Sequence, residues 1–406
     1  MPEHARHFHA IEEALQQTTC LVVKLGSQVI VDEQGRLAID RIASYVKQLS
    51  ALLQQGKRVV IVSSGAVALG RQRLKLPPEL PLTPEQKQSC AAIGQSLMMT
   101  MYHQFFRHYS LEVAQVLVNP SDFSDRQRYN RLKTLLHSLL ELGIIPIVNE
   151  NDAIPDLQCF DEQWASSRLS PFSDNDKLAA LISAQVNAHL LIILSNVEGL
   201  YTANPFKEKT AKRLTYISDL SALDDIDTSG KTSLGRGGMA SKLQAAELAN
   251  FAGSHVVIAS GLTHQSIEQL LEFRGENGDF PATFLAAKNA QDTRYKQWIG
   301  MASGYNGVIV INHGAANALL KQGASLLAVG VVDVLGQFYA GDVVAVHVEG
   351  MLNEVARGIV QYSATELALI KGLQSQAIQE TLKRADVEVI HRDKLVVERV
   401  NEERVL

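Results

Sequence analysis

The sequence predicts an α/β fold, a three-layer αβα sandwich with a mainly parallel sheet, followed by a small C-terminal β-barrel. Between residues 21 and 259, helical stretches alternate with short apolar runs, which is typical of βαβ units. These runs are continuously apolar, as expected for strands that helices cover on both faces. After residue 281, short β-rich runs separated by glycine replace this pattern. The chain has 406 residues, more than one hydrophobic core usually serves, so we expect two domains.

The elements of the first domain follow in order from this pattern. Residues 21–23 form the first predicted strand, and Ile42, Val46, Leu49 and Leu53 recur on one face of the first helix. Gly56 ends that helix before the next strand at 59–62. The other predicted elements are helices at 132–142, 178–182 and 241–252, which precede strands at 144–148, 190–194 and 256–258 respectively.

The second domain is predicted to contain strands at 307–311, 331–334 and 343–348 and a helix near 315–321. A turn-rich stretch at 276–281 marks the end of the first domain. We therefore divide the chain into an α/β domain at 18–275, a β-barrel domain at 292–385 and a C-terminal tail at 386–406.

The composition argues against several classes of protein. A formal net charge of -5 provides no general attraction for nucleic acid or an anionic membrane. The cysteines, Cys20, Cys90 and Cys159, are scattered, which argues against a disulfide framework and a zinc site. The first twenty residues lack the apolar core of a secretion signal, and no later segment has the length of a membrane span. We therefore expect a cytoplasmic protein whose partner is a small solute.

Polar residues follow the predicted strands. The five exits read Lys24-Leu25-Gly26-Ser27, Ser63-Ser64-Gly65-Ala66, Asn149-Glu150-Asn151-Asp152, Ser195-Asn196 and Ser260-Gly261. In open α/β sheets, ligands bind outside the carboxyl ends of the strands, so these patches should converge on one crevice. Turn chemistry explains Gly, Ser and Asn here, but not a lysine that ends an apolar strand. The pattern therefore favours a binding site over ordinary turns.

Two lysines and a glycine-rich loop have the chemistry to contact phosphate. Residues 235–242 read Gly-Arg-Gly-Gly-Met-Ala-Ser-Lys before a predicted helix, so backbone N–H groups, the helix dipole and Lys242 would suit a phosphate. Lys24 stands two residues before Gly26, where a phosphate could approach bare backbone. Taken alone, the loop also fits a solvated loop or a dinucleotide motif. No strand precedes it, and no acidic residue lies about twenty positions on, which argues against a nicotinamide dehydrogenase.

Acidic and amide side chains form a second group. Asp174-Asn175-Asp176 stands before a predicted helix, where it could be an ordinary N-cap or part of a site. Together with Asn149 and Asp152, these are residue types that hold an ammonium group or a magnesium ion.

Six short motifs follow one another along residues 21–261. They are Val22-Val23-Lys24-Leu25-Gly26-Ser27, Val62-Ser63-Ser64-Gly65-Ala66-Val67-Ala68-Leu69-Gly70, Val148-Asn149-Glu150-Asn151-Asp152, Phe172-Ser173-Asp174-Asn175-Asp176, Gly199-Leu200-Tyr201-Thr202-Ala203-Asn204-Pro205 and the run from Gly235 to Lys242. In this order they resemble the glutamate 5-kinase family of the amino-acid kinase superfamily. Gly314-Ala315-Ala316, Gly323-Ala324-Ser325-Leu326-Leu327 and Gly341-Asp342-Val343-Val344 resemble a PUA domain, a small barrel found in many members.

The resemblance implies the amino-acid kinase fold and ATP-dependent phosphorylation of the γ-carboxylate of L-glutamate, as proline synthesis begins. It implies that Lys24 and Lys242 bracket the phosphates while Asp176 orients both lysines. The residues that would hold glutamate are Ser64, Asn149, Asp152 and Asn175. The residues that would bind the nucleotide are Lys24, Gly26, Ser195, Asn196, Arg236, Gly237, Gly238, Met239, Ala240, Ser241 and Lys242. Mg²⁺ would accompany ATP, held largely by phosphate oxygens.

The resemblance also implies a homo-oligomer, a dimer or tetramer, and feedback inhibition by L-proline. The chain departs from the family pattern at Asn196, where aspartate is usual, and at Ser173, where glycine is usual. It also has a longer loop at 153–173, between two expected glutamate-binding motifs.

Two other functions stay open at this point. A kinase of the same fold could act on aspartate, acetylglutamate or uridylate. Alternatively, a catalytically inactive kinase fold could serve as a regulatory or RNA-binding module through its PUA-like end. Residues 292–406 contain 11 Lys and Arg against 13 Asp and Glu, which is no electrostatic footprint for RNA.

Overall fold

A computed structural model describes most of the chain. The described residues are 3–77, 79–155, 174–203, 208, 210–218, 238–263, 266–275, 280–287, 307–351, 354–382 and 388–397. The chain divides into two compact units, one comprising Met1–Asn119 and Asn130–Ala290 and the other Pro120–Tyr129 and Gln291–Leu406. The domain boundaries inferred from sequence, at 18–275, 292–385 and 386–406, stay a prediction.

The first unit is built on an eight-stranded sheet with the strand order β3-β4-β2-β1-β5-β7-β8-β6. Its strands are β1 (Cys20–Leu25), β2 (Arg58–Ser63), β3 (Val113–Val118), β4 (Ile145–Glu150), β5 (Leu190–Ser195), β6 (Tyr216–Ile217), β7 (His255–Ser260) and β8 (Thr283–Leu285). Neighbouring strands from β3 to β7 are parallel, and β8 is antiparallel to β7. The predicted α/β class with a mainly parallel sheet is therefore confirmed.

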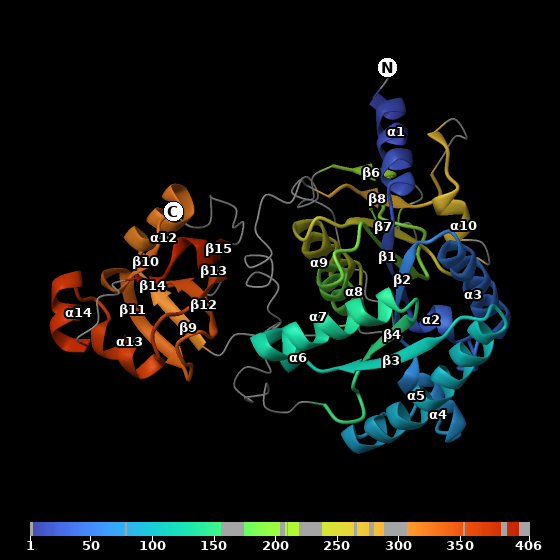
Figure 1. Cartoon of the computed structure of the whole chain (residues 1–406), viewed down its shortest axis with the longest axis horizontal. Coiled ribbons are helices and arrows are strands. Elements are labelled where there is room, and N and C mark those ends of the chain that lie inside the picture. Colours follow the sequence, from blue (N-terminus) through green and yellow to red (C-terminus); the bar gives the residue numbers. More distant parts are fainter. Residues whose placement is uncertain are drawn as a thin grey trace. The chain divides into compact units, whose positions relative to one another are not determined.

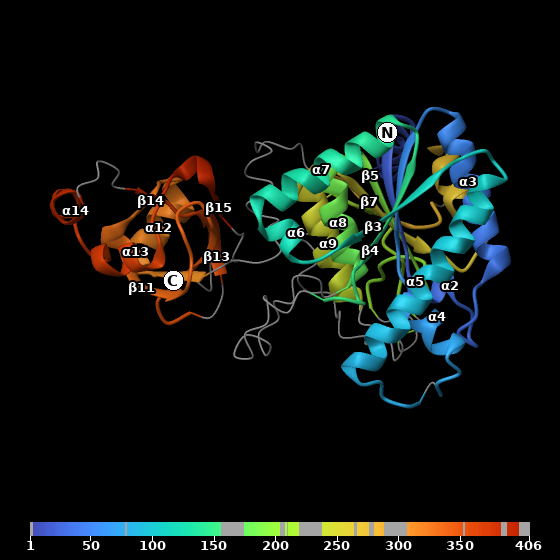
Figure 2. The same cartoon turned by 60° about the horizontal axis from the view of Figure 1, so that its bottom comes forward.

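Helices cover both faces of this sheet (Figure 1). They are α1 (Glu3–Gln16), α2 (Ser27–Ile30), α3 (Ile39–Gln54), α4 (Ala66–Arg73), α5 (Pro84–Arg107), α7 (Arg126–Glu141), α8 (Asn175–Gln185), α9 (Met239–Phe251) and α10 (Ser266–Leu271). The short helix α6 (Ser121–Ser124) and the first residues of α7 belong to the second unit. Figure 2 shows α7, α8 and α9 on one face and α2, α3 and α5 on the other. The central strands β1 and β5 are buried along their whole length, which explains their continuously apolar sequences.

Helix α1 lies in a segment for which the sequence supported no interpretation. Phe8, Ile11 and Leu15 recur on one helix face and join the main hydrophobic core, where Phe8 contacts Phe273 edge to face. The ring of His7 also stacks on Tyr216. Because α1 packs beside elements far along the chain, its place could not be read from local periodicity.

Helices α4 and α5 contact each other backbone to backbone through two glycines. A Cβ atom at Gly94 would overlap the carbonyl oxygen of Ala66, and one at Gly70 would overlap that of Cys90. A capping box at Thr83 fixes the start of α5, because its hydroxyl accepts from Gln86 N and the Gln86 side chain accepts from Thr83 N. The close contact at the two glycines therefore holds α5 against α4, the helix that follows β2.

The second unit is rich in strands. A five-stranded sheet has the order β11-β9-β12-β13-β15, and β10 pairs with β14. The strands are β9 (Gly307–Ile311), β10 (Leu326–Leu327), β11 (Val331–Gly336), β12 (Val343–Val348), β13 (Glu354–Ile359), β14 (Glu388–Ile390) and β15 (Leu395–Val397), and the helices are α12 (His313–Gln322), α13 (Ala364–Ile370) and α14 (Ser375–Leu382). The strands and helix predicted at 307–348 are all present. Residues 388–397, assigned from sequence to a tail, supply β14 and β15.

In the part of the chain that the structure describes, no helix has both the length and the apolar character needed to cross a membrane.

The contact between α4 and α5 yields the first prediction. Substitution Gly94→Ala should lower the free energy of unfolding of the first unit by about 3 kcal/mol, because the new methyl group forces two helix backbones apart. Urea unfolding followed by circular dichroism measures this change. The neighbouring substitution Ser96→Ala, on the exposed face of α5, should change it by less than about 0.5 kcal/mol. Equal effects of both substitutions would contradict the packing described here.

Candidate active site

The polar strand exits predicted from sequence lie along one edge of the sheet. The order β4-β2-β1-β5-β7 and the parallel pairing bring all five carboxyl ends to the same edge. The register places Leu25 beside Ser63 on one side and beside Leu194 on the other. Ser195 in turn pairs with Ser260. The predicted convergence of these patches is therefore confirmed.

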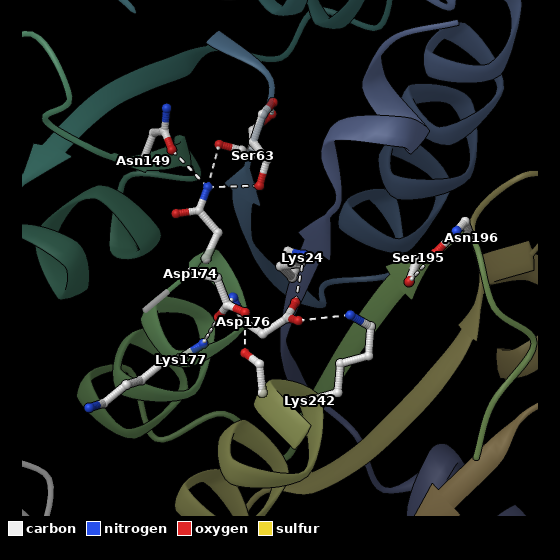
Figure 3. A network of polar contacts seen from close by, with 12 residues as sticks. Lys24, Ser63, Asn149, Asp174, Asp176, Lys177, Ser195, Asn196 and Lys242 are labelled. Atoms are coloured by element: carbon white, nitrogen blue, oxygen red, sulfur yellow. Dashed lines mark hydrogen bonds and ion pairs between the residues drawn. The ribbon is translucent and has the colours of Figure 1, made fainter. Parts of the chain in front are cut away.

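Two lysines meet one buried carboxylate at the centre of this edge (Figure 3). The Nζ atom of Lys24, in β1, lies 2.5 Å from Oδ1 of Asp176, and Nζ of Lys242, in α9, lies 3.0 Å from Oδ2. Asp176 is 0% exposed, and the two lysines are 7% and 6% exposed. The three side chains come from three separate segments of the chain, so only the folded sheet brings them together.

The electrostatics of this cluster follow from its burial and its two cations. Burial alone would raise the pKa of the Asp176 carboxyl, but the charges of Lys24 and Lys242 and their hydrogen bonds outweigh that effect and lower the pKa. Asp176 is therefore ionised at neutral pH. With both lysines protonated, the cluster carries one net positive charge at the carboxyl edge of the sheet.

Asp174 holds the N-termini of α8 and α9 together. Its Oδ1 atom accepts hydrogen bonds from the backbone N–H groups of Asp176 at 3.0 Å and Lys177 at 3.2 Å, which caps α8. Its Oδ2 atom accepts from the hydroxyl of Ser241 in the first turn of α9. The N-cap interpretation of Asp174 is thus correct, and the same side chain also orients the helix that carries Lys242.

A chain of amide hydrogen bonds lies on the other side of Asp176. The Nδ2 atom of Asn175 donates to Ser64 Oγ at 2.8 Å and to Asn149 Oδ1 at 2.9 Å. Asn149 Nδ2 then donates to Oε1 of Gln95 at 3.0 Å. The structure therefore brings together three residues that the sequence assigned to the acceptor substrate, and Asn175 and Asp176 join this group directly to the lysine cluster.

Gly26 and Ser195 lie at the adjoining strand ends. A Cβ atom at Gly26 would lie 3.3 Å from Leu194 O and 3.6 Å from Lys24 Nζ, so a larger residue would crowd the lysine. Ser195 is buried and donates its hydroxyl to Asn196 Oδ1 at 3.2 Å, while Asn196 is exposed. This is the side on which the sequence predicts the nucleotide.

The other site residues predicted from sequence lie at the start of α9, after β4 or outside the described residues. Gly238 is the N-cap of α9, and Met239, Ala240 and Ser241 form its first turn. Asp152 lies in the turn that follows β4. Arg236 and Gly237 lie outside the described residues, as do Ser173 and most of the long loop at 153–173.

Sequence reasoning missed two side chains that contact the site from α5. Gln95 accepts from Asn149, and the hydroxyl of Tyr102 lies 3.0 Å from Ser63 Oγ. The available signal was the spacing of Gln95, Met98 and Tyr102, which places a polar side chain on the buried face of a helix.

The buried cluster yields a stability prediction. Substitution Asp176→Asn should lower the free energy of unfolding by about 3 to 5 kcal/mol, because it leaves two buried ammonium groups without a countercharge. Lys24→Met should cost less, since Asp176 keeps Lys242. Folding lowers the pKa of Asp176, so its contribution is complete above the ordinary carboxyl pKa of about 3.9 and is lost as the pH falls through the lowered value.

Urea unfolding at neutral pH and in steps below about pH 4 measures these effects. The control is Asp32→Asn, which weakens an exposed ion pair with Arg36 and should cost less than about 1 kcal/mol. If Asp176→Asn cost no more than Asp32→Asn, the cluster would not be the electrostatic centre described here.

Comparison with known proteins agrees with this geometry. The model of the amino acid kinase family matches residues 19–260, and that of the PUA domain matches residues 307–382. A glutamate 5-kinase of Thermoanaerobacter sp. (strain X514) is 40% identical over 381 residues, covering 93% of this chain and 97% of the relative. A glutamate 5-kinase of Moorella thermoacetica is 39% identical over 386 residues, covering 95% and 97% respectively.

Among solved structures, the isopentenyl phosphate kinase of T. acidophilum aligns with a TM-score of 0.44 and 16% identity, covering 66% of this chain and 100% of the other. The two family models together match parts of both units. The chain belongs to the amino acid kinase family.

Proposed function

We propose that the chain transfers the γ-phosphoryl group of ATP to the side-chain carboxylate of L-glutamate, giving L-glutamyl 5-phosphate and ADP. The relatives named above, which share about 40% of its residues over nearly the whole chain, are glutamate 5-kinases. The observation that carries the proposal is the buried Lys24–Asp176–Lys242 cluster, which presents net positive charge without a general base. The product would be the acyl phosphate with which proline synthesis begins.

The charge of the cluster suits this reaction. A glutamate carboxylate, with an ordinary pKa of about 4.3, is already ionised at neutral pH and needs no base to attack phosphorus. The barrier comes from bringing an anion to a polyanion, so positioning and positive charge must supply the catalysis. Asp176 is a poor proton acceptor because both of its oxygens contact ammonium groups and its pKa is lowered. It acts by holding Lys24 and Lys242 in place.

The amide side of the site suits an amino acid. A primary amide has two N–H groups, and those of Asn175 are used by Ser64 and Asn149. Its Oδ1 atom is therefore the group that Asn175 can offer to a ligand, and a carbonyl oxygen accepts from an ammonium group. Ser64, Asn149, Asp152 and Asn175 form the proposed glutamate site.

The nucleotide side comprises Gly26, Ser195, Asn196 and the run from Arg236 to Lys242. Two helix N-termini, those of α8 and α9, meet there through Asp174 and favour negative charge. Mg²⁺ would enter with ATP and shield its phosphate charge. Because the Asp176 oxygens already contact ammonium groups, the main ligands of Mg²⁺ would be phosphate oxygens.

Further parts of the proposal rest on the sequence alone, either through the family resemblance or through composition and pattern. They are assembly into a dimer or tetramer, feedback inhibition by L-proline, a cytoplasmic location, and a structural or regulatory role for the PUA domain. The domain boundaries given above belong with them.

Purified protein should release ADP with Mg²⁺, ATP and L-glutamate, and added hydroxylamine should trap the acyl phosphate as a hydroxamate. Aspartate, acetylglutamate and UMP, tested in parallel, should give little ADP. Release with another acceptor would retain a kinase but overturn the substrate. If no acceptor gave ADP release and a filter-binding assay showed RNA retention, the results would favour an inactive RNA-binding module.

Substitutions Lys24→Ala and Lys242→Ala should each lower turnover by about a hundredfold or more, because each removes a positive charge from the phosphoryl group in the transition state. The fold should persist, since Asp176 keeps the other lysine. Steady-state kinetics and thermal unfolding measure the two effects.

Lys47→Ala is the matched control, because Lys47 is exposed on α3 and belongs to none of the strand exits. Turnover near that of the unaltered protein in either cluster variant would remove that lysine from the mechanism.

A further inference from the structure

Gln95 is a buried glutamine in the middle of α5 that none of the sequence motifs includes. It is 7% exposed, and its Oε1 atom accepts the hydrogen bond from Asn149. Its Nε2 atom is buried and has no hydrogen-bond partner among the described residues. A buried unpaired donor costs free energy that an apolar side chain of the same size would avoid. The oxygen of this side chain must therefore serve a purpose.

The orientation of every amide in this group depends on one backbone carbonyl. Ser63 O can only accept, and it lies 3.4 Å from Asn175 Nδ2, where an amide oxygen would be repelled. This side of the Asn175 amide must therefore be its NH₂ group, whose two N–H groups donate to Ser64 and Asn149. The oxygen of Asn149 then faces Asn175, and its NH₂ group faces Gln95. Gln95 must present its oxygen. We call Ser63, Asn175, Asn149 and Gln95 the amide relay.

Helix α5 holds Gln95 rigidly against this relay. Gly94, the preceding residue, lies against the backbone of Ala66, two residues after Ser64. One and two turns further along α5, Met98 and Tyr102 contact the hydroxyl of Ser63 at 3.1 and 3.0 Å. The buried face of α5 therefore supports the ends of both β2 and β4, the strands that carry the proposed glutamate site.

We propose that Gln95 is a positioning residue for the acceptor substrate. Its oxygen fixes the amide of Asn149, which in turn holds Asn175 so that the Oδ1 atom of Asn175 faces the ligand. The relay thereby selects an acceptor that brings a hydrogen-bond donor, the ammonium group of an amino acid. This inference rests on the proposed function. It adds a residue that lies outside the motifs and acts through Asn149 without touching the substrate.

The test compares two identical substitutions on the same helix. Gln95→Met removes the acceptor and keeps the side-chain length, and it should raise KM for glutamate about tenfold, because the Asn149 amide loses its partner and its orientation. KM for ATP should stay within about twofold of the unaltered protein, since none of the residues proposed to bind the nucleotide belongs to the relay. Gln104→Met, on the exposed side of α5, is the control and should change neither.

Two further variants separate positioning from general loss of packing. In Asn149→Ala, Gln95 has nothing left to hold, so adding Gln95→Met should raise KM for glutamate by less than about twofold more. Gln95→Glu keeps an acceptor oxygen in place and should leave KM for glutamate within about threefold of the control Gln104→Glu. Gln95→Glu tests the direction of the hydrogen bond even if Gln95→Met does not fold. A carboxylate cannot donate, so Gln95→Glu would lose the contact if Gln95 donated to Asn149 instead of accepting from it.

The outcomes separate this inference from the function on which it rests. If the unaltered protein does not phosphorylate glutamate, the proposed function fails, and the relay is not a glutamate subsite. If it does so and Gln95→Met behaves like Gln104→Met, the function stands and the positioning role is wrong. Equal increases in KM for both substrates, additive effects with Asn149→Ala, or a large increase in Gln95→Glu would also overturn it. A selective, non-additive rise in KM for glutamate supports it.

Discussion

The buried ion pairs of Asp176 with Lys24 and Lys242 organise the first unit around its carboxyl edge. A charge in this position is tolerated only because it is paired on both sides, and the pairing requires β1, α8 and α9 to hold a fixed arrangement. The capping contacts of Asp174 supply that arrangement, since they join the two helix starts. The same contacts that allow the three charges to be buried also hold both lysine ammonium groups at one place on the carboxyl edge of the sheet.

The position of Asn175 directly before Asp176 joins two chemical environments. One residue belongs to a relay of neutral amides, and the next belongs to a cluster of charges. Both lie at the start of α8, so an acceptor bound to the amides and a phosphoryl group bound to the lysines would meet there. Helix α5 supports the amide side through Gln95 and Tyr102, and Gly94 allows that helix to approach closely enough.

Much of this arrangement could be predicted from sequence, because it depends on local patterns. The continuously apolar strands and the lysine that ends β1 are visible in the chain, and the parallel order implied that the exits would converge. The role of Asp176 as the shared partner of two lysines came from resemblance. Gln95 and α1 could not be predicted in the same way, because each matters through contacts with residues distant in sequence, Asn149 for Gln95 and Phe273 for Phe8.

The role of the two lysines in phosphoryl transfer is tested most directly by a crystal structure with ADP, Mg²⁺, glutamate and aluminium fluoride, which mimics the transferring phosphoryl group. Both lysine Nζ atoms should contact the fluoride group while keeping their contacts with Asp176, and the glutamate ammonium should lie beside Asn175. A fluoride group bound away from the two lysines, or Asp176 released from them to ligate the metal, would contradict this role of the cluster.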